Sequence, residues 1–324
     1  MSISVDDRFL DSALAADELA ADARAGLTAE PKSLPPRWFY DARGSELFEQ
    51  ITELPEYYPT RTERQILDRH ADDIAAAAGV RTVVELGSGS SIKTQLLLDA
   101  WQRAGTLQRI VTVDVSVSAL VEAAQVLTVR YPAAELQPVR ADFTRHLTEL
   151  DTVGKTAIVF LGSTIGNLDP AQRGQFFRSV RQALGSGDVL LLGTDLVKPA
   201  SILVPAYDDS AGVTAEFNLN VLRVLNRELD GDIPVEAFEH RAVWNPVAER
   251  IEMRLRTRRA LDVRLADIDL EVHFDEGEEL LTEISSKFRR DGIESELAAA
   301  GLRLNHWWTD PLDNFAVSLS SPID

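Results

Sequence analysis

The sequence predicts an α/β protein in which a doubly wound, mostly parallel sheet carries an inserted α+β domain. Between residues 82 and 195, short β-branched apolar runs alternate with helical patterns, which is typical of parallel strands joined by helices. Several of these runs end in glycine or in an acidic residue. Residues 301–319 predict two strands joined by an Asp-Pro turn, and these would add an antiparallel hairpin to the sheet.

The individual elements follow from apolar spacing and from helix-breaking residues. Residues 8–26 predict an amphipathic helix, and the pair Pro35-Pro36 then interrupts regular structure. Between residues 237 and 272, alternating arginine and apolar residues predict strands outside the main sheet. Further helices are expected over residues 44–51, 60–78, 206–229 and 287–300, and sheet strands over 83–86, 110–114, 158–161 and 188–195.

This order of elements predicts two domains. The sheet domain would comprise residues 60–196 and 286–324, and the second domain residues 8–59 and 197–285. In such sheets ligands bind outside the carboxyl ends of the strands, so an added layer there would enclose a small substrate.

The first strand ends in Gly87-Ser88-Gly89, a turn with little side chain to obstruct a ligand. Asp114 ends the next strand, 27 positions after Gly87, where a carboxylate would hold ribose hydroxyls. The next two runs end near Asp142-Phe143, suited to an adenine ring, and in the loop that starts at Gly162-Ser163. Each feature alone is also typical of an ordinary turn or helix cap. Together they predict one nucleotide-binding crevice.

The spacing distinguishes between nucleotides. A dinucleotide fingerprint needs a third glycine where Ile92 stands, and Lys93-Thr94 lacks the glycine spacing of a P-loop. A ligand without a pyrophosphate needs less bare backbone. The pattern therefore favours S-adenosylmethionine.

Composition excludes several other functions. The 324 residues carry a formal net charge of −19, which argues against nucleic acid as a partner. The chain has no cysteine and no His-x-x-x-His pair, so we expect no metal site. We found no apolar run of 18 residues and no secretory signal, and we expect a cytoplasmic protein with no membrane partner. No long apolar stripe is evident, which favours a monomer.

Four segments carry a specific resemblance that covers essentially the whole chain. They are KSLPPRWFYD at residues 32–41, LPEYYPTRTE at 54–63, FLGSTIGN at 160–167 and LLGTD at 191–195. In these segments the chain resembles the bacterial histidine N-alpha-methyltransferases of ergothioneine biosynthesis. The resemblance implies a class I methyltransferase fold and three methyl transfers from S-adenosylmethionine to the α-amine of L-histidine, giving hercynine.

The resemblance also implies site residues, and the chain matches the family's pattern at each of them. The cofactor positions correspond to Gly87, Lys93, Asp114, Asp142 and Phe143, to which the strand-tip pattern adds Ser88, Gly162 and Ser163. The histidine-binding positions correspond to Tyr57, Asn167, Tyr207, Glu283 and Ser285, with Tyr40 and Met253 nearby in the pocket.

Side-chain chemistry suggests a role for each group. Glu283 can accept an imidazole N–H while Ser285 bonds the other ring nitrogen, so this pair would read the substrate's side chain. Asn167 and Tyr207 would hold its amino-acid end. As catalytic residues we expect Asn167 to orient the amine, and Tyr40 or Tyr57 to carry its proton away.

Four alternatives remain open at this point. Glu283 could merely solvate the surface, and the aromatic residues around 38–58 could merely pack the core. A methyltransferase of the same fold could act on another amino acid, such as tryptophan. More distantly, the chain could be an adenosyl-binding regulator without catalytic activity.

Overall fold

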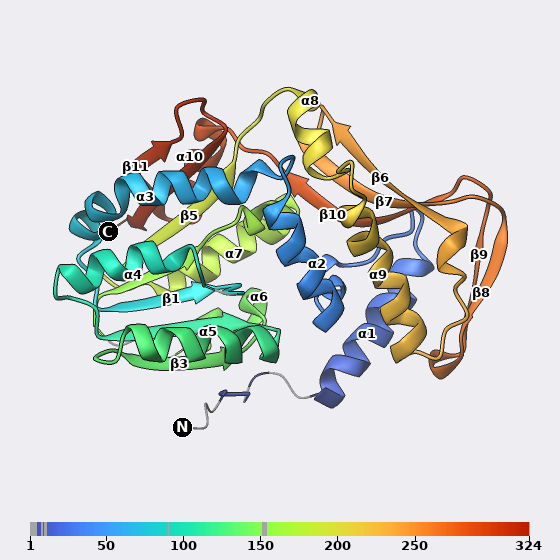
Figure 1. The fold of residues 1–324 in the computed structure, drawn as a ribbon, viewed down its shortest axis with the longest axis horizontal. Coiled ribbons are helices and arrows are strands. Elements are labelled where there is room, and N and C mark those ends of the chain that lie inside the picture. The colour runs from blue at the N-terminus through green and yellow to red at the C-terminus, as the bar shows by residue number, and fades with distance from the viewer. Residues whose placement is uncertain (1–4, 8, 10–11, 90, 151–153, 324) are drawn as a thin grey trace. The chain divides into compact units, whose positions relative to one another are not determined.

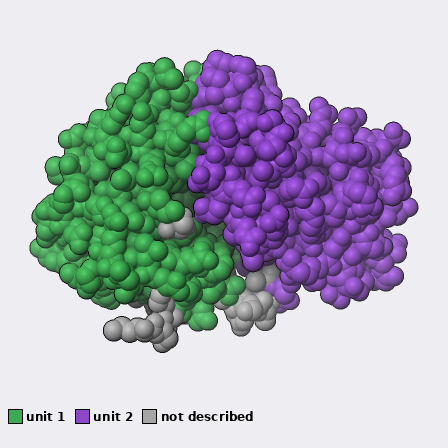
Figure 2. All heavy atoms as spheres, in the orientation of Figure 1, with its two compact units in different colours: residues 1–10, 59–197, 287–324 green, residues 11–58, 198–286 purple. Residues whose placement is uncertain are grey.

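In the computed structural model, residues 5–7, 9, 12–89, 91–150 and 154–323 are described. The chain divides into two compact units (Figure 2). Unit 1 comprises Met1–Leu10, Pro59–Val197 and Lys287–Asp324, and unit 2 comprises Asp11–Tyr58 and Lys198–Ser286. The sequence predicts boundaries at 59/60, 196/197 and 285/286, and the units break one residue from each; its predicted start of the second domain, residue 8, lies three residues before Asp11.

Unit 1 contains a seven-stranded sheet in the order β11-β12-β5-β4-β1-β2-β3. Strands β1 to β5 run parallel, while β12 is antiparallel to β5 and β11 is antiparallel to β12. The strands span Thr82–Leu86 (β1), Arg109–Asp114 (β2), Glu135–Arg140 (β3), Thr156–Phe160 (β4), Val189–Asp195 (β5), Leu302–Thr309 (β11) and Phe315–Pro322 (β12).

Helices cover both faces of this sheet (Figure 1), because successive apolar residues of a strand point to opposite faces. Val83 belongs to the core formed with α3, α4 and α5, and Val84 to the core formed with α7 and α10. The helices span Tyr58–Ala78 (α3), Thr94–Arg103 (α4), Val117–Arg130 (α5), Phe143–His146 (α6), Pro170–Ala183 (α7) and Arg290–Ala299 (α10).

Unit 2 packs helices against a three-stranded antiparallel sheet, order β10-β7-β6, and includes a two-stranded hairpin, β8-β9. Helix α2 packs against α9 (Figure 1), and both contribute to the apolar core of this unit. The elements span Ser12–Leu27 (α1), Ala42–Glu53 (α2), Ala200–Leu203 (α8), Val213–Glu228 (α9), Phe238–Asn245 (β6), Arg250–Thr257 (β7), Leu261–Leu265 (β8), Leu270–Phe274 (β9) and Glu279–Ser286 (β10).

The predicted α/β architecture and the terminal hairpin are confirmed, and the differences lie at the ends of elements. The helix expected from residue 206 begins at Val213, after a 3-10 turn over Val204–Ala206 and a loop that carries Tyr207. The helix expected from residue 287 begins at Arg290, because Phe288 pairs with Leu196 beside the end of β5. Residues 8, 10 and 11 of the first predicted helix lie outside the described residues.

Candidate active site

The glycine turn after β1 has the backbone conformation that its sequence predicts. Gly87 and Gly89 have φ angles of 63° and 48°, a region that favours glycine. The N–H groups of Gly87 and Ser88 both donate to the carbonyl of Val113, over 2.8 and 3.1 Å. These bonds join the ends of β1 and β2.

Asp114, at the end of β2, is tied to the same turn. Its carboxylate accepts hydrogen bonds from the backbone N–H groups of Gly89 and Ser116, each over 2.9 Å. Burial raises the pKa of Asp114 above its ordinary value. A carboxylate has about four acceptor positions, so the backbone donors around Asp114 leave capacity for a ribose hydroxyl.

The turn also contains a feature that suits a ligand. The hydroxyl oxygen of Ser88 is buried, and among the described residues it has no hydrogen-bond partner. A buried polar group without a partner costs free energy, and a bound polar ligand would remove that cost. The residues present therefore fit an adenosyl ligand.

The third strand tip brings an aromatic ring to this turn. A Cβ on Gly87 would lie 4.0 Å from the ring of Phe143, which itself packs against Phe160 and Phe176. The Asp142 side chain caps helix α6, because it accepts from the Thr144 N–H over 2.8 Å and from its hydroxyl over 2.6 Å. The alternative that Asp142 is a helix cap is thus correct in part. This role leaves open a further contact between its carboxylate and a ligand.

Lys93 is held by a residue to which the sequence alone assigns no role. Its ammonium pairs with Glu63, whose side chain is fully buried on α3. Both carboxylate oxygens of Glu63 also accept the backbone N–H of Gly162, over 2.8 and 3.0 Å. A Cβ on Gly193 would come within 2.0 Å of this carboxylate. Glu63 therefore ties together the loops after β1 and β4.

The loop after β4 is anchored to the end of β5. Ser163 adopts a left-handed conformation (φ 57°), and its hydroxyl accepts the backbone N–H of Asp195 over 2.9 Å. Asp195 forms a fully buried ion pair with Lys287 over 2.8 Å. Asn167 lies half-buried at the end of the 3-10 helix Thr164–Asn167 that follows. The Ser163 hydroxyl thus has a structural partner.

Glu85, in β1 beneath the glycine turn, is a buried carboxyl. It accepts hydrogen bonds from the hydroxyls of Ser91, over 2.7 Å, and of Thr94. Burial raises the pKa of Glu85 from 4.5 to about 7. Between these pH values the native protein binds a proton that the unfolded chain releases, so the free energy of unfolding falls as the pH rises through this window.

We expect the Glu85→Gln variant to lack this contribution, because glutamine stays neutral. The free energy of unfolding of the variant minus that of the wild type should therefore increase by about 3 kcal/mol between pH 4.5 and 8. Urea unfolding of both proteins across this range measures the difference. A difference that does not change with pH would show that Glu85 does not titrate there.

In unit 2, the predicted aromatic residues gather in one cluster. Tyr57 and Tyr207 meet edge to face with ring centroids 6.2 Å apart, and both side chains are buried. Phe48 of α2 contacts Tyr57 and Tyr40, and Phe217 of α9 contacts Tyr40. The sequence did not single out Phe48 or Phe217, because each lies at ordinary helical spacing. We call these five residues the aromatic cluster.

Two polar histidine-binding candidates of unit 2, Glu283 and Ser285, lie on strand β10, beside β7. Glu283 of β10 stands opposite Met253 of β7, and Ser285 opposite Ile251. Glu283 is only 8% exposed, which excludes the interpretation of a solvated surface glutamate. The Tyr207 hydroxyl lies 2.8 Å from the Ser285 hydroxyl. Tyr207 thereby links the aromatic cluster to this strand.

The structure groups the candidates by unit. All eight cofactor candidates lie in unit 1, while Tyr40, Tyr57, Tyr207, Met253, Glu283 and Ser285 lie in unit 2. Asn167 belongs to unit 1, whereas the other histidine-binding candidates belong to unit 2.

Among the described residues, no group of acidic, histidine or cysteine side chains is placed to hold a metal ion. Over those same residues, no helix is long and apolar enough to cross a bilayer.

The fold and the strand-tip site define the class of protein. A parallel sheet of order 3-2-1-4-5 extended by an antiparallel hairpin, with a glycine turn and acidic residues at its strand ends, is the class I S-adenosylmethionine-dependent methyltransferase fold. Within that class, the sequence model of one family, the histidine-specific, S-adenosylmethionine-dependent methyltransferases, matches residues 19–322. The chain belongs to this family.

Individual relatives agree with the family assignment. The chain is 57% identical to a histidine N-alpha-methyltransferase of Mycolicibacterium smegmatis, over 94% of this chain and 95% of the relative. It is 53% identical to the enzyme of that name from Mycobacterium tuberculosis, over 94% of each chain. Ergothioneine biosynthesis protein 1 of Neurospora crassa is 32% identical over 69% of this chain and 28% of its own length.

Proposed function

We propose that this protein transfers three methyl groups from S-adenosylmethionine to the α-amino nitrogen of L-histidine, giving hercynine for ergothioneine biosynthesis. The observation that carries the proposal is the buried pair Glu283 and Ser285 in a chain of the histidine-specific family. A carboxylate and a hydroxyl on one strand can bond the two nitrogens of an imidazole. An indole has a single ring nitrogen and can bond only one of them.

In this proposal unit 1 binds the methyl donor and unit 2 binds histidine. Asp114 accepts the ribose hydroxyls, Asp142 and Phe143 hold the adenine, and Ser88 donates to the ligand. Gly87 and Gly162 leave room for it, while Lys93 and Ser163 complete the contacts. S-adenosylmethionine, when bound, supplies a methyl group already activated on a sulfonium sulfur.

The residues of the chain then have two tasks, to aim the amine and to remove its proton. Only a neutral amine has the lone pair that forms the new N–C bond, and each transfer leaves an ammonium that must lose a proton before the next. We assign the proton's exit to Tyr40 or Tyr57. Tyr207 and Asn167 hold the amino-acid end, and orientation supplies most of the acceleration.

The aromatic cluster suits a substrate whose nitrogen gains alkyl groups and a permanent charge. Ring faces of tyrosine and phenylalanine attract a quaternary ammonium through cation–π interactions. The trimethylated nitrogen has no lone pair, so the reaction stops at three methyl groups. A cluster that bound this product too tightly would slow turnover.

Mass spectrometry of a reaction with the purified protein, S-adenosylmethionine and an equimolar mixture of the twenty amino acids tests the proposal. We expect histidine heavier by three methyl groups and every other amino acid unchanged. Methylation of another amino acid, such as tryptophan, would overturn the assignment of Glu283 and Ser285. Binding of S-adenosylmethionine without any methylated product would indicate a regulator instead.

A further inference from the structure

Strand β10 contains an extra residue immediately before Glu283. Leu281 stands opposite Arg254 of β7, and Glu283 stands opposite the adjacent residue Met253. Thr282 therefore has no partner of its own in the ladder, which is the arrangement of a β-bulge.

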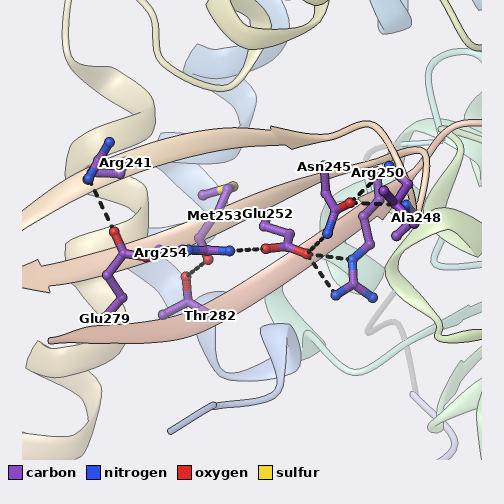
Figure 3. A network of polar contacts seen from close by, with 10 residues as sticks. Arg241, Asn245, Ala248, Arg250, Glu252, Met253, Arg254, Glu279 and Thr282 are labelled. Atoms are coloured by element: carbon purple, nitrogen blue, oxygen red, sulfur yellow. Dashed lines mark hydrogen bonds and ion pairs between the residues drawn. The ribbon is translucent and has the colours of Figure 1, made fainter. Parts of the chain in front are cut away.

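This bulge decides which face of the sheet Glu283 occupies. Side chains alternate between faces, so without the bulge Glu283 would stand opposite Glu252 instead of Met253. Met253 faces the apolar core of unit 2. Glu252 lies in a different setting, an ion-pair network with Arg250 and Arg254 (Figure 3). The extra residue thus places both Glu283 and Ser285 on the face of Met253.

Buried hydrogen bonds hold the bulge in place. The Thr282 hydroxyl lies 2.9 Å from the carbonyl of Met253 (Figure 3) and 2.6 Å from the amide oxygen of Asn218 on α9. The Asn218 amide nitrogen donates to the carbonyl of Arg254 over 3.2 Å and lies 2.8 Å from Nδ1 of His240. Thr282 and Asn218 are almost fully buried.

His240 extends these bonds to the loop of Tyr207. Its Nε2 lies 2.7 Å from the Tyr207 carbonyl, and a carbonyl can only accept, so Nε2 donates. Burial lowers the pKa of His240, which favours the neutral ring with Nδ1 accepting from Asn218. The Tyr207 hydroxyl in turn lies against Ser285, and the bulge lies next to Glu283. The hydrogen bonds therefore connect the two residues of the proposed imidazole site.

We propose that Thr282, Asn218 and His240 are positioning residues that set the specificity for histidine. They fix the β10 register that turns Glu283 and Ser285 toward the substrate, and they fix the loop that carries Tyr207. None of the three needs to touch the substrate. The inference rests on the proposed function, since it concerns how that site recognises its ring.

The test compares Thr282→Val, which keeps the shape and removes the hydroxyl, with the wild type. We expect KM for histidine to rise about tenfold while KM for S-adenosylmethionine stays unchanged. The competitive inhibition constant of β-(2-thienyl)alanine, whose ring has no nitrogen, should also stay unchanged. Thr282→Ser restores the hydroxyl and should recover the wild-type KM. His240→Phe should raise KM for histidine in the same way, because it cuts the link to Tyr207.

Thr257→Val is the matched control. Thr257 is buried at the C-terminal end of β7, away from the bulge, and its hydroxyl also bonds backbone carbonyls, those of Asp275 and Glu278. If folded Thr282→Val and His240→Phe behave like this control, with KM for histidine unchanged, the inference is overturned. If the wild type does not methylate histidine at all, the proposed function fails instead.

Discussion

The double variant Glu283→Ala, Met253→Val is expected to lose at least about 100-fold in kcat/KM for histidine and to gain measurable methylation of tryptophan. Removal of a buried, charged acceptor that reads the substrate costs about 3 kcal/mol or more in the transition state. The two residues stand opposite each other on β10 and β7, so shortening both makes room for a larger ring. Steady-state kinetics with each amino acid measures the change.

Glu279→Ala is the control for loss of charge on the same strand. Glu279 pairs with Arg241 and Arg254 in the network of Figure 3. This variant should keep the wild-type preference for histidine. Strict histidine preference in the double variant would show that Glu283 does not read the imidazole.

Glu63→Leu is expected to raise Kd for S-adenosylmethionine about 50-fold. The substitution leaves the Gly162 N–H without its acceptor and Lys93 without its buried partner, so the loops after β1 and β4 lose their common anchor. Calorimetric titration with S-adenosylmethionine measures the change in Kd. Of the proposed histidine-binding residues only Asn167 lies on one of these loops, so the larger effect should fall on the methyl donor.

Asp188→Leu separates this local effect from a general loss of stability. Asp188 is also a buried carboxylate that accepts two backbone N–H groups, those of Thr156 and Gly185, each over 2.8 Å. It lies at the opposite end of strands β4 and β5. Both variants should unfold more easily, but an equal loss of affinity in both would contradict the role of Glu63.

Local sequence signals were sufficient to predict the strands and their tips. Apolar β-branched runs such as Val83-Val84 predict a strand buried on both faces, and glycine or acid at its end marks where helices and ligands begin. Asp114 was predicted in this way to lie at the end of a strand. The aromatic cluster was predicted only in part. Tyr40 and Tyr57 belong to an aromatic-rich segment with several prolines and Tyr207 follows from the family resemblance, whereas Phe48 and Phe217 resemble any core residue of a helix.

The rest depends on contacts between distant residues. Glu63 is one of many charged residues in α3, and its importance arises from Gly162, 99 positions later. The bulge at Thr282 depends on the register between β7 and β10, which no local pattern in β10 reveals. Sequence periodicity describes one element at a time, whereas these features belong to pairs of elements.

The two-segment composition of unit 2 has a consequence for how the chain is made. Leu47 and Ile51 of α2 belong to the same core as Leu222 and Leu225 of α9, yet residues 59–197 separate the two segments. Ribosomes add about 5–20 residues per second, and domains generally fold as units during synthesis. Several seconds therefore pass between the synthesis of the first segment and that of the second, while the parallel strands of unit 1 emerge from the ribosome. During this time the apolar surface of the first segment is exposed to chaperones.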